Sequence, residues 1–540
     1  MDEDRIAFDK PRRTWRWWTA RAVLVLLALL LIFHRPIIFR VGRLVADRYA
    51  AKANLKLDCT LEGTIFTNVA IRNLHVSPIG PTIVESIDVD YIRADYSLWD
   101  WMRRGSTELL KNLEVRNARV VLDPAKASLK PKIPPPDERL KLFPVFPERL
   151  LLSDVNLLVR STTEKPDFLL EHLLFELDPK NPGQLRAAVL QIPNADAWRN
   201  ISATTSYTNK NLVISGLKLD DQNEFRLIAF DASHISGRSL EVVLDASLAG
   251  GTIAGSLGLR ETPESLNTKV RFVAENISLD TLRGYLGRPP EFLAGDVQHL
   301  AIEGDGTIDT PRTWTGSVQA QINNLRQENL FFDRVAVSVA ARGGVATVDS
   351  GEATNGSNKI GFKGTTELPA HIREFGRYGA RFELNGSFPD LQSLTARFAQ
   401  PLTGAATITG TAEIKDAVMR ADLSFSGGPV AYADAGATQI TGTRKASKEM
   451  PPANQRKMYY DDLHSQIHIE MTDGHTGENL FDSAVADISS DGQNVKVERF
   501  VAMRKENTFT ASGSYVLPDD LAQLRTQPAT FSVSLGAIEL

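Results

Sequence analysis

The chain has 540 residues, more than one compact hydrophobic core accommodates, so the sequence predicts several units or an array of stacked elements. Its formal net charge of −5 gives no electrostatic basis for binding nucleic acid. The single cysteine, Cys59, excludes an intrachain disulfide, and its alternating sequence context predicts a small, buried apolar side chain.

The first feature along the chain is one hydrophobic segment, residues 22–39. The uninterrupted apolar part of this segment ends at Phe33 and is shorter than the ~20 residues of a membrane-spanning helix. A helix that spans the membrane must therefore also include the residues up to Phe39 or the tryptophans that precede the segment. Arginines in residues 1–21 predict a cytoplasmic N-terminus. A cleaved signal peptide is the alternative, but no small-residue cleavage site follows. We interpret the segment as an uncleaved transmembrane anchor, with membrane-interface tryptophans at Trp15, Trp17 and Trp18.

From Leu55 onward, apolar and polar residues alternate, which is typical of antiparallel strands with one buried face. The clearest alternation covers residues 55–65, 240–248, 335–341, 380–384 and 509–517. The predicted fold is therefore mostly β, a long antiparallel sheet. Asn-Gly and Asp-Gly pairs favour tight hairpins at Asp305-Gly306, Asn355-Gly356, Asn385-Gly386 and Asp491-Gly492.

Two stretches interrupt the alternation. Residues 126–147 contain many prolines and predict an extended loop, and the charged stretch 442–462 predicts a surface insertion with some helical character. Short helices are expected at Ser97–Arg104, Leu279–Leu286 and Leu391–Phe398.

The last two of these helices belong to an internal repeat. Leu279, Leu282 and Leu286 recur at a fixed offset as Leu391, Leu394 and Phe398, and each set is followed by proline and then by Leu-x-Gly. The repeats cover residues 279–295 and 391–404, and such a unit is typical of arrays built by stacking neighbours. The final residues match the strand that precedes each helix, so we expect the sequence to end within a repeat.

No constellation of residues predicts catalysis. The glycines of residues 250–258 lie between strands, without the helix that a phosphate site needs. His464 and His468, near Asp461 and Asp462, could bind a metal, but solvated side chains are the better interpretation because no third ligand is specified. The sequence therefore predicts no enzyme, no cofactor and no resident metal.

Taken together, these features resemble the AsmA-like family, including its larger TamB-type members. The resemblance covers nearly the whole chain through motifs that are individually degenerate. It rests on the anchor, the charged amphipathic stretch 41–57, the Leu-x-Gly strand pair at 61–77, the strand–helix–strand order over 86–123, and the repeats at 279–295 and 391–404.

The resemblance implies a bacterial inner-membrane protein with a single span and its bulk in the periplasm. It implies an N-terminal AsmA-like segment at 40–125 and a repeating segment at 148–540, whose sheet curls into an open hydrophobic groove. Phospholipids moving between the inner and outer membranes, in support of outer-membrane integrity, would be its ligands. The alternative is a scaffold that assists assembly of outer-membrane β-barrel proteins, with such a protein or another envelope protein at the C-terminal sheet edge.

Apolar side chains at alternate strand positions are the candidates for lining this groove. They suit non-specific contact with acyl chains, which contributes ~0.8 kcal/mol per buried CH₂ group. The candidates are Leu240, Val242, Leu244, Leu248, Val335, Val337, Val339, Phe382 and Leu384.

Overall fold

The structure of the protein is a computed structural model. Among the residues that the structure describes, no helix is both long and apolar enough to cross a membrane. The predicted anchor up to residue 38, the tryptophans at 15, 17 and 18, and residues 127–146 of the proline-rich loop lie outside these residues. The described residues are 39–40, 42–64, 67–104, 109–126, 147–160, 168–193, 196–234, 237–262, 265–285, 293–327, 330–371, 374, 378–396, 401–450, 460–519 and 527–537.

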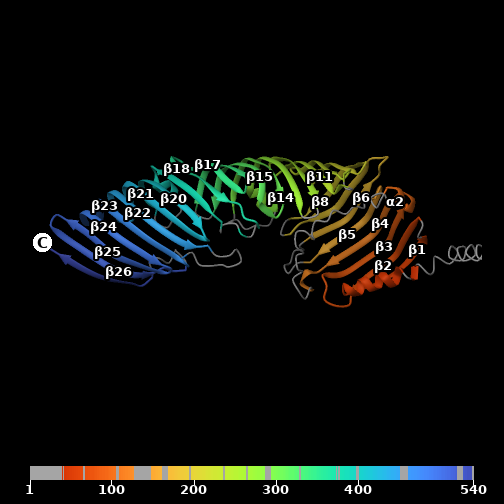
Figure 1. Ribbon diagram of the computed structural model, residues 1–540, viewed down its shortest axis with the longest axis horizontal. Coiled ribbons are helices and arrows are strands. Elements are labelled where there is room, and N and C mark those ends of the chain that lie inside the picture. The colour runs from red at the N-terminus through yellow and green to blue at the C-terminus, as the bar shows by residue number, and fades with distance from the viewer. Residues whose placement is uncertain are drawn as a thin grey trace, which may run out of the picture. The chain divides into compact units, whose positions relative to one another are not determined.

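Most of the described chain is β-strand, and its 27 strands belong to one open sheet with few short helices (Figure 1). This confirms the mostly β prediction. The sheet is uncurled, so the curled groove expected from the sequence is not what the structure shows. The reason is physical: alternation fixes which residues share a face, whereas curvature depends on twist and bulges that alternation does not encode.

The described residues divide between Ile214 and Ser215 into two compact units. In the first unit, consecutive strands pair from β1 to β8. Its elements are β1 (Leu55–Thr64), β2 (Asn68–Pro78), β3 (Val84–Tyr96), α2 (Leu98–Arg104), β4 (Leu110–Leu122), η2 (Pro124–Lys126), β5 (Arg149–Val159), β6 (Phe168–Leu177), β7 (Gly183–Gln191) and β8 (Trp198–Thr208), and β9 (Asn211–Lys218) spans the boundary.

In the second unit, each strand from β10 to β27 pairs antiparallel with its neighbours in sequence. Its elements are β10 (Glu224–Asp231), β11 (Ser239–Leu248), β12 (Gly251–Glu261), β13 (Leu266–Ser278), α4 (Leu279–Tyr285), β14 (Ala294–Thr307), β15 (Thr310–Gln327), β16 (Leu330–Arg342), β17 (Val345–Asn355), β18 (Asn358–Glu367), β19 (Ala380–Phe388), α5 (Leu391–Thr395), β20 (Leu402–Lys415), β21 (Val418–Tyr432), β22 (Ala435–Glu449), β23 (Leu463–Thr476), β24 (Asn479–Asp491), β25 (Asn494–Arg504), β26 (Asn507–Val516) and β27 (Ala529–Gly536).

One strand pair departs from the antiparallel pattern. β4 and β5 run parallel, with Asn112 opposite Arg149 and Leu122 opposite Val159. A parallel pair needs a long crossover, and the residues between Leu122 and Arg149 are numerous enough to supply one. The proline-rich stretch thus separates two strands that point the same way, a role that its composition does not predict.

A helical segment, residues 42–52, precedes β1. The Arg43 guanidinium donates to the carbonyl oxygen of Cys59 at 2.8 Å and to the carboxylate of Asp58 at 3.2 Å. Both acceptors belong to β1, which pairs with β2 on one side. The Cys59 side chain is partly buried, and this burial raises the pKa of its thiol.

The predicted short helices are confirmed as α2, α4 and α5, with α5 ending earlier than expected, at Thr395. Two predicted hairpins, at Asn355-Gly356 and Asp491-Gly492, are also confirmed. The other two pairs lie inside β14 and β19. A Cβ atom on Gly306 would lie 2.7 Å from the Trp314 ring, and one on Gly386 would lie 2.7 Å from the Phe388 ring. These glycines therefore make room for aromatic rings.

The predicted insertion at 442–462 is wrong for its first part, because residues up to Glu449 continue β22. Residues 451–459 lie outside the described part of the chain. The prediction failed because Arg444 and Lys448 occupy alternate positions where apolar residues were expected, and this disguised the strand.

Candidate functional site: the apolar face of the second unit

The strand register of the second unit brings apolar residues from distant parts of the sequence into rows. Residues that pair directly across neighbouring strands point to the same face of a sheet. The central row runs through Phe225, Ala246, Ile253, Ala274, Leu300, Ala320, Val337, Gly351, Phe362, Leu384, Gly410, Leu423, Arg444, Ile467, Ile488, Val497, Gly513 and Phe531.

Two flanking rows lie on the same face, because Val335, Val337 and Val339 alternate along β16 and each belongs to a different row. The Val335 row runs through Ile277, Val297, Ile322, Val335, Ala353, Ile360, Gly386, Ile408, Phe425, Gly442, Ile469, Ala486, Phe500, Ala511 and Val533. The Val339 row runs through Ile228, Leu244, Gly255, Phe272, Ile302, Val318, Val339, Val348, Gly364, Phe382, Ala412, Ala421, Ala446, Ser465, Ser490, Val495, Tyr515 and Ala529. We call the surface made by these three rows the apolar face.

The register places every candidate named from the sequence on this face. Leu244, Val335, Val337, Val339, Phe382 and Leu384 are members of the rows, and Leu240, Val242 and Leu248 alternate with Leu244 along β11. All nine side chains are neither fully buried nor fully exposed. The described chain therefore covers this face only in part.

The opposite face is polar from β17 to β25. There, the row through Glu352 continues through Gly361, Asn385, Thr409, Ser424, Thr443, His468, Asp487 and Arg499. Ser338 and Ser247 also lie on the polar face. A sheet with one apolar and one polar face leaves the apolar face in need of a cover.

Phenylalanine rings on the apolar face lie against glycines of the neighbouring strand. A Cβ atom on Gly351 would come within 2.3 Å of the Phe362 ring, its partner across β17 and β18. The same arrangement joins Gly442 to Phe425, at 2.4 Å. Because no side chain stands at the glycine, each ring can lie down over the backbone. Further pairs are Gly364 with Phe382, Gly513 with Phe531, and Gly255 with Phe272.

The short helix α4 covers one part of the apolar face. Its residues Leu279, Leu282 and Tyr285 pack against a buried cluster made by Ala249, Ala274, Ile277 and Val297. Three of these four residues belong to the rows, so the face is locally closed at β13 and β14. The Tyr285 hydroxyl accepts a 2.6 Å hydrogen bond from the amide of the fully buried Asn223.

The repeat found in the sequence corresponds to this helix and the strand after it. The second copy, α5, starts at the buried Leu391, and the Asp390 side chain accepts from the backbone amides of Gln392 and Ser393. Each Leu-x-Gly glycine has a positive φ: +135° at Gly295 and +105° at Gly404. The strand register shifts beside each of them, so the repeated glycine forms a β-bulge.

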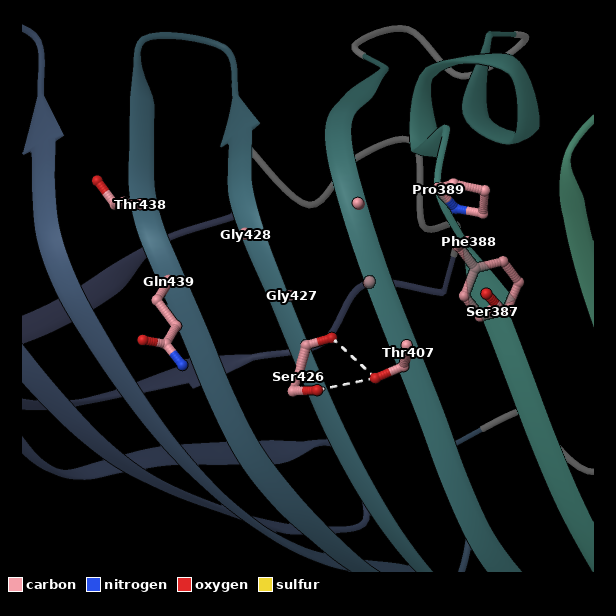
Figure 2. Close-up of a pocket in the computed structure, with 11 residues that line it drawn as sticks. Ser387, Phe388, Pro389, Thr407, Ser426, Gly427, Gly428, Thr438 and Gln439 are labelled. Carbon is pink, nitrogen blue, oxygen red and sulfur yellow. Dashed lines mark hydrogen bonds between the residues drawn. The ribbon is translucent and has the colours of Figure 1, made fainter.

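A hollow of about 530 Å³ lies over β19 to β22 (Figure 2). The exposed hydroxyls of Thr407 and Ser426 contact each other across it at 2.8 Å, and the Phe388 ring and Gln439 lie at its sides. No lining residue is titratable, so the hollow offers hydrogen bonds but no acid, base or nucleophile pair. It does not support a catalytic function.

The two histidines considered as metal ligands have separate partners. His464 Nδ1 lies 3.0 Å from Asp491, and His468 lies 2.7 Å from Asp487 through Nδ1 and 3.3 Å from Glu470 through Nε2. The hydrogen bond to Asp487, and then the one to Glu470, raises the pKa of His468 above 6.5. No group of three or more potential metal ligands occurs among the described residues.

Sequence reasoning missed two features of the apolar face, the glycine–phenylalanine pairs and Arg444. Both depend on cross-strand register, which links residues through hairpins of varying length.

Comparison of the chain with protein-family models, curated proteins and solved structures finds no match.

Proposed function

We propose that the protein binds phospholipid acyl chains on the apolar face of its second unit and carries them through the periplasm from an inner-membrane anchor. The observation that supports this best is the set of three mainly apolar rows that the strand register aligns across the second unit. Many of their side chains are half-exposed, although α4 covers the rows at β13 and β14 and Arg444 interrupts one of them. The resemblance to AsmA-like proteins points the same way.

The chemistry of the face suits acyl chains better than a defined small molecule. Its rows contain aliphatic residues, alanine and glycine with flattened phenylalanine rings, and they lack convergent polar groups over most of their length. A site for a specific small molecule places a few polar groups for orientation. Acyl chains need only apolar area, which contributes roughly 25 cal/mol per Å² buried.

A second function, assistance to outer-membrane β-barrel proteins, is favoured by one observation. All residues of β27 are exposed, and among described strands it pairs with β26 alone. An available strand edge can template pairing with another strand. This function uses backbone groups, whereas the lipid function uses side chains of the apolar face.

Charge placed on the apolar face separates the two functions. Val337→Asp and Leu244→Asp put a carboxylate where acyl chains would lie, and burying it beside lipid costs several kcal/mol, by order of magnitude. We expect phospholipid to co-purify with the wild-type protein, as measured by mass spectrometry, and we expect both variants to lose it together with envelope integrity in cells.

Ser338→Asp and Ser247→Asp are matched controls, because they add the same charge to the polar face of the same two strands. These controls should keep both lipid and function. If all four folded variants retain equal amounts of lipid, the lipid function is wrong. An equal loss of β-barrel assembly in all four variants would also be inconsistent with the lipid function.

The proposed topology has its own test. With an anchor at 22–39 and the N-terminus in the cytoplasm, protease added to spheroplasts should degrade everything beyond a short N-terminal fragment. A C-terminal epitope that stays intact in spheroplasts but is cleaved after lysis would contradict this topology.

A further inference from the structure

Arg444 is the one charged residue in the three rows of the apolar face, counted over the residues that the structure describes. It lies in the middle of β22, opposite Leu423 on one side and Ile467 on the other. Its neighbours on the same face of β22 are Gly442 and Ala446. A guanidinium here is surrounded by apolar positions, which normally disfavours a charge.

The local contacts do not neutralise this charge. Arg444 Nε donates a 3.3 Å hydrogen bond to the hydroxyl of the buried Ser465, and within the described part of the chain no carboxylate lies within ion-pair distance. Ser465 pairs with Ser490 in the next strand, so a second hydroxyl lies on the same face one strand further from Arg444. Lys448 follows on this face at the end of β22.

We propose that Arg444, with Ser465 beside it, binds the phosphate of a phospholipid whose acyl chains lie on the apolar residues around it. This proposal rests on the proposed function and adds a headgroup site to it. Arginine matches a phosphate because its planar fork donates two parallel hydrogen bonds, and the guanidinium is weakly hydrated, which suits a partly buried position. The surrounding apolar rows offer the contact that a free phosphate would not use.

The test measures lipid binding by the full-length protein purified in detergent. The probes are phosphatidylglycerol, a diacylglycerol with the same acyl chains, and inorganic phosphate. Arg444→Leu should weaken binding of phosphatidylglycerol about tenfold or more, since a charge-assisted hydrogen-bond pair is lost. Binding of diacylglycerol should stay unchanged or improve, because leucine extends the apolar row.

Two further variants make the result specific. Arg444→Lys keeps the charge without the fork and should give an intermediate affinity. Lys445→Leu removes a positive charge from the adjacent position on the polar face and should leave all three probes unaffected. The wild-type protein should show no measurable binding of inorganic phosphate alone.

Several results would overturn the proposal. If Arg444→Leu weakens the binding of both lipids equally, Arg444 has a structural role. If the binding of neither lipid changes, Arg444 does not bind the phosphate. Inorganic phosphate that binds as well as phosphatidylglycerol would identify a site for free phosphate. If Val337→Asp abolishes lipid binding while Arg444→Leu preserves it, the headgroup site fails and the lipid function stands. A wild-type protein that binds neither lipid contradicts both.

Discussion

At the scale of single residues, glycines decide how closely the strands and rings of the second unit approach. Gly404 combines two demands, a φ of +105° and a position where a Cβ atom would lie 1.7 Å from the carbonyl oxygen of Pro429. Gly343 has a φ of +60° but open space around it. The first position forbids any side chain, whereas the second only disfavours one.

Alanine substitutions should reflect this difference. Gly404→Ala adds a steric clash to backbone strain and should destabilise β20 and β21 by about 2–4 kcal/mol. Gly343→Ala carries the strain alone, about 1 kcal/mol. Hydrogen exchange of the amides in each hairpin measures both, and equal effects would show that the bulge can relax.

His468 gives a residue-scale prediction about pH. Its pKa is raised above 6.5, mainly by the hydrogen bond to Asp487. The protonated imidazole therefore stabilises the fold below the unfolded pKa, and this contribution is lost as the pH rises through the folded pKa. Local protection of β23 and β24 should fall as the pH rises above 6.5 and through the raised pKa of His468. Asp487→Asn should lower the pKa measured by NMR titration; an unchanged pKa would point to another cause.

At the scale of elements, the short helices are held by the sheet and not by their own length. α5 has five residues, too few to be stable alone, and its first residue, Leu391, is 9% exposed. Its neighbour Gln392 is exposed. One face of this short helix therefore carries its stability.

Truncation of each side chain tests this asymmetry. Leu391→Ala should cost about 2–4 kcal/mol through lost burial and a residual cavity. Gln392→Ala should change stability by at most about 0.5 kcal/mol. Denaturant unfolding followed by hydrogen exchange of β19 and β20 gives both values. Similar costs for the two variants would mean that the helix is held by its cap and not by Leu391.

At the scale of the whole molecule, contacts follow the order of the sequence, because each paired strand meets its chain neighbours. In such an array, stability is approximately a sum of local and nearest-neighbour contributions. A destabilising change in one hairpin should therefore remain local. Gly404→Ala should increase exchange in β20 and β21 while leaving β10 to β13 within error of the wild-type protein. Uniform loss of protection across the second unit would instead indicate one cooperative block.

How far the sequence predicted this architecture depends on the range of the interaction. Alternation along single strands identified β11, β16 and β19 and assigned Leu244, Val337 and Leu384 to one side, because a side-chain period of two is a local property. The Leu-x-Gly motif identified the repeated unit because it, too, is a local property of the sequence.

Features that depend on register were not predictable in this way. Bulges at Gly295 and Gly404, the parallel pair of β4 and β5, and the position of Arg444 among apolar neighbours all arise between strands. Arg444 also prevented the prediction of β22, since a charge at an apolar position breaks the alternation on which strand prediction relies.

The flattened phenylalanine rings have a consequence for motion. A ring that projects from a sheet creates a ridge. A molecule that moves across the sheet would meet an energy barrier at each such ridge. Rings lying over Gly351 and Gly442 remove such ridges, so neighbouring positions, ~4.8 Å apart, differ little in contact energy. On so even an energy surface, an acyl chain bound as we propose would slide with low friction, and the proposed headgroup site at Arg444 would be the place, among the described residues, where its movement slows.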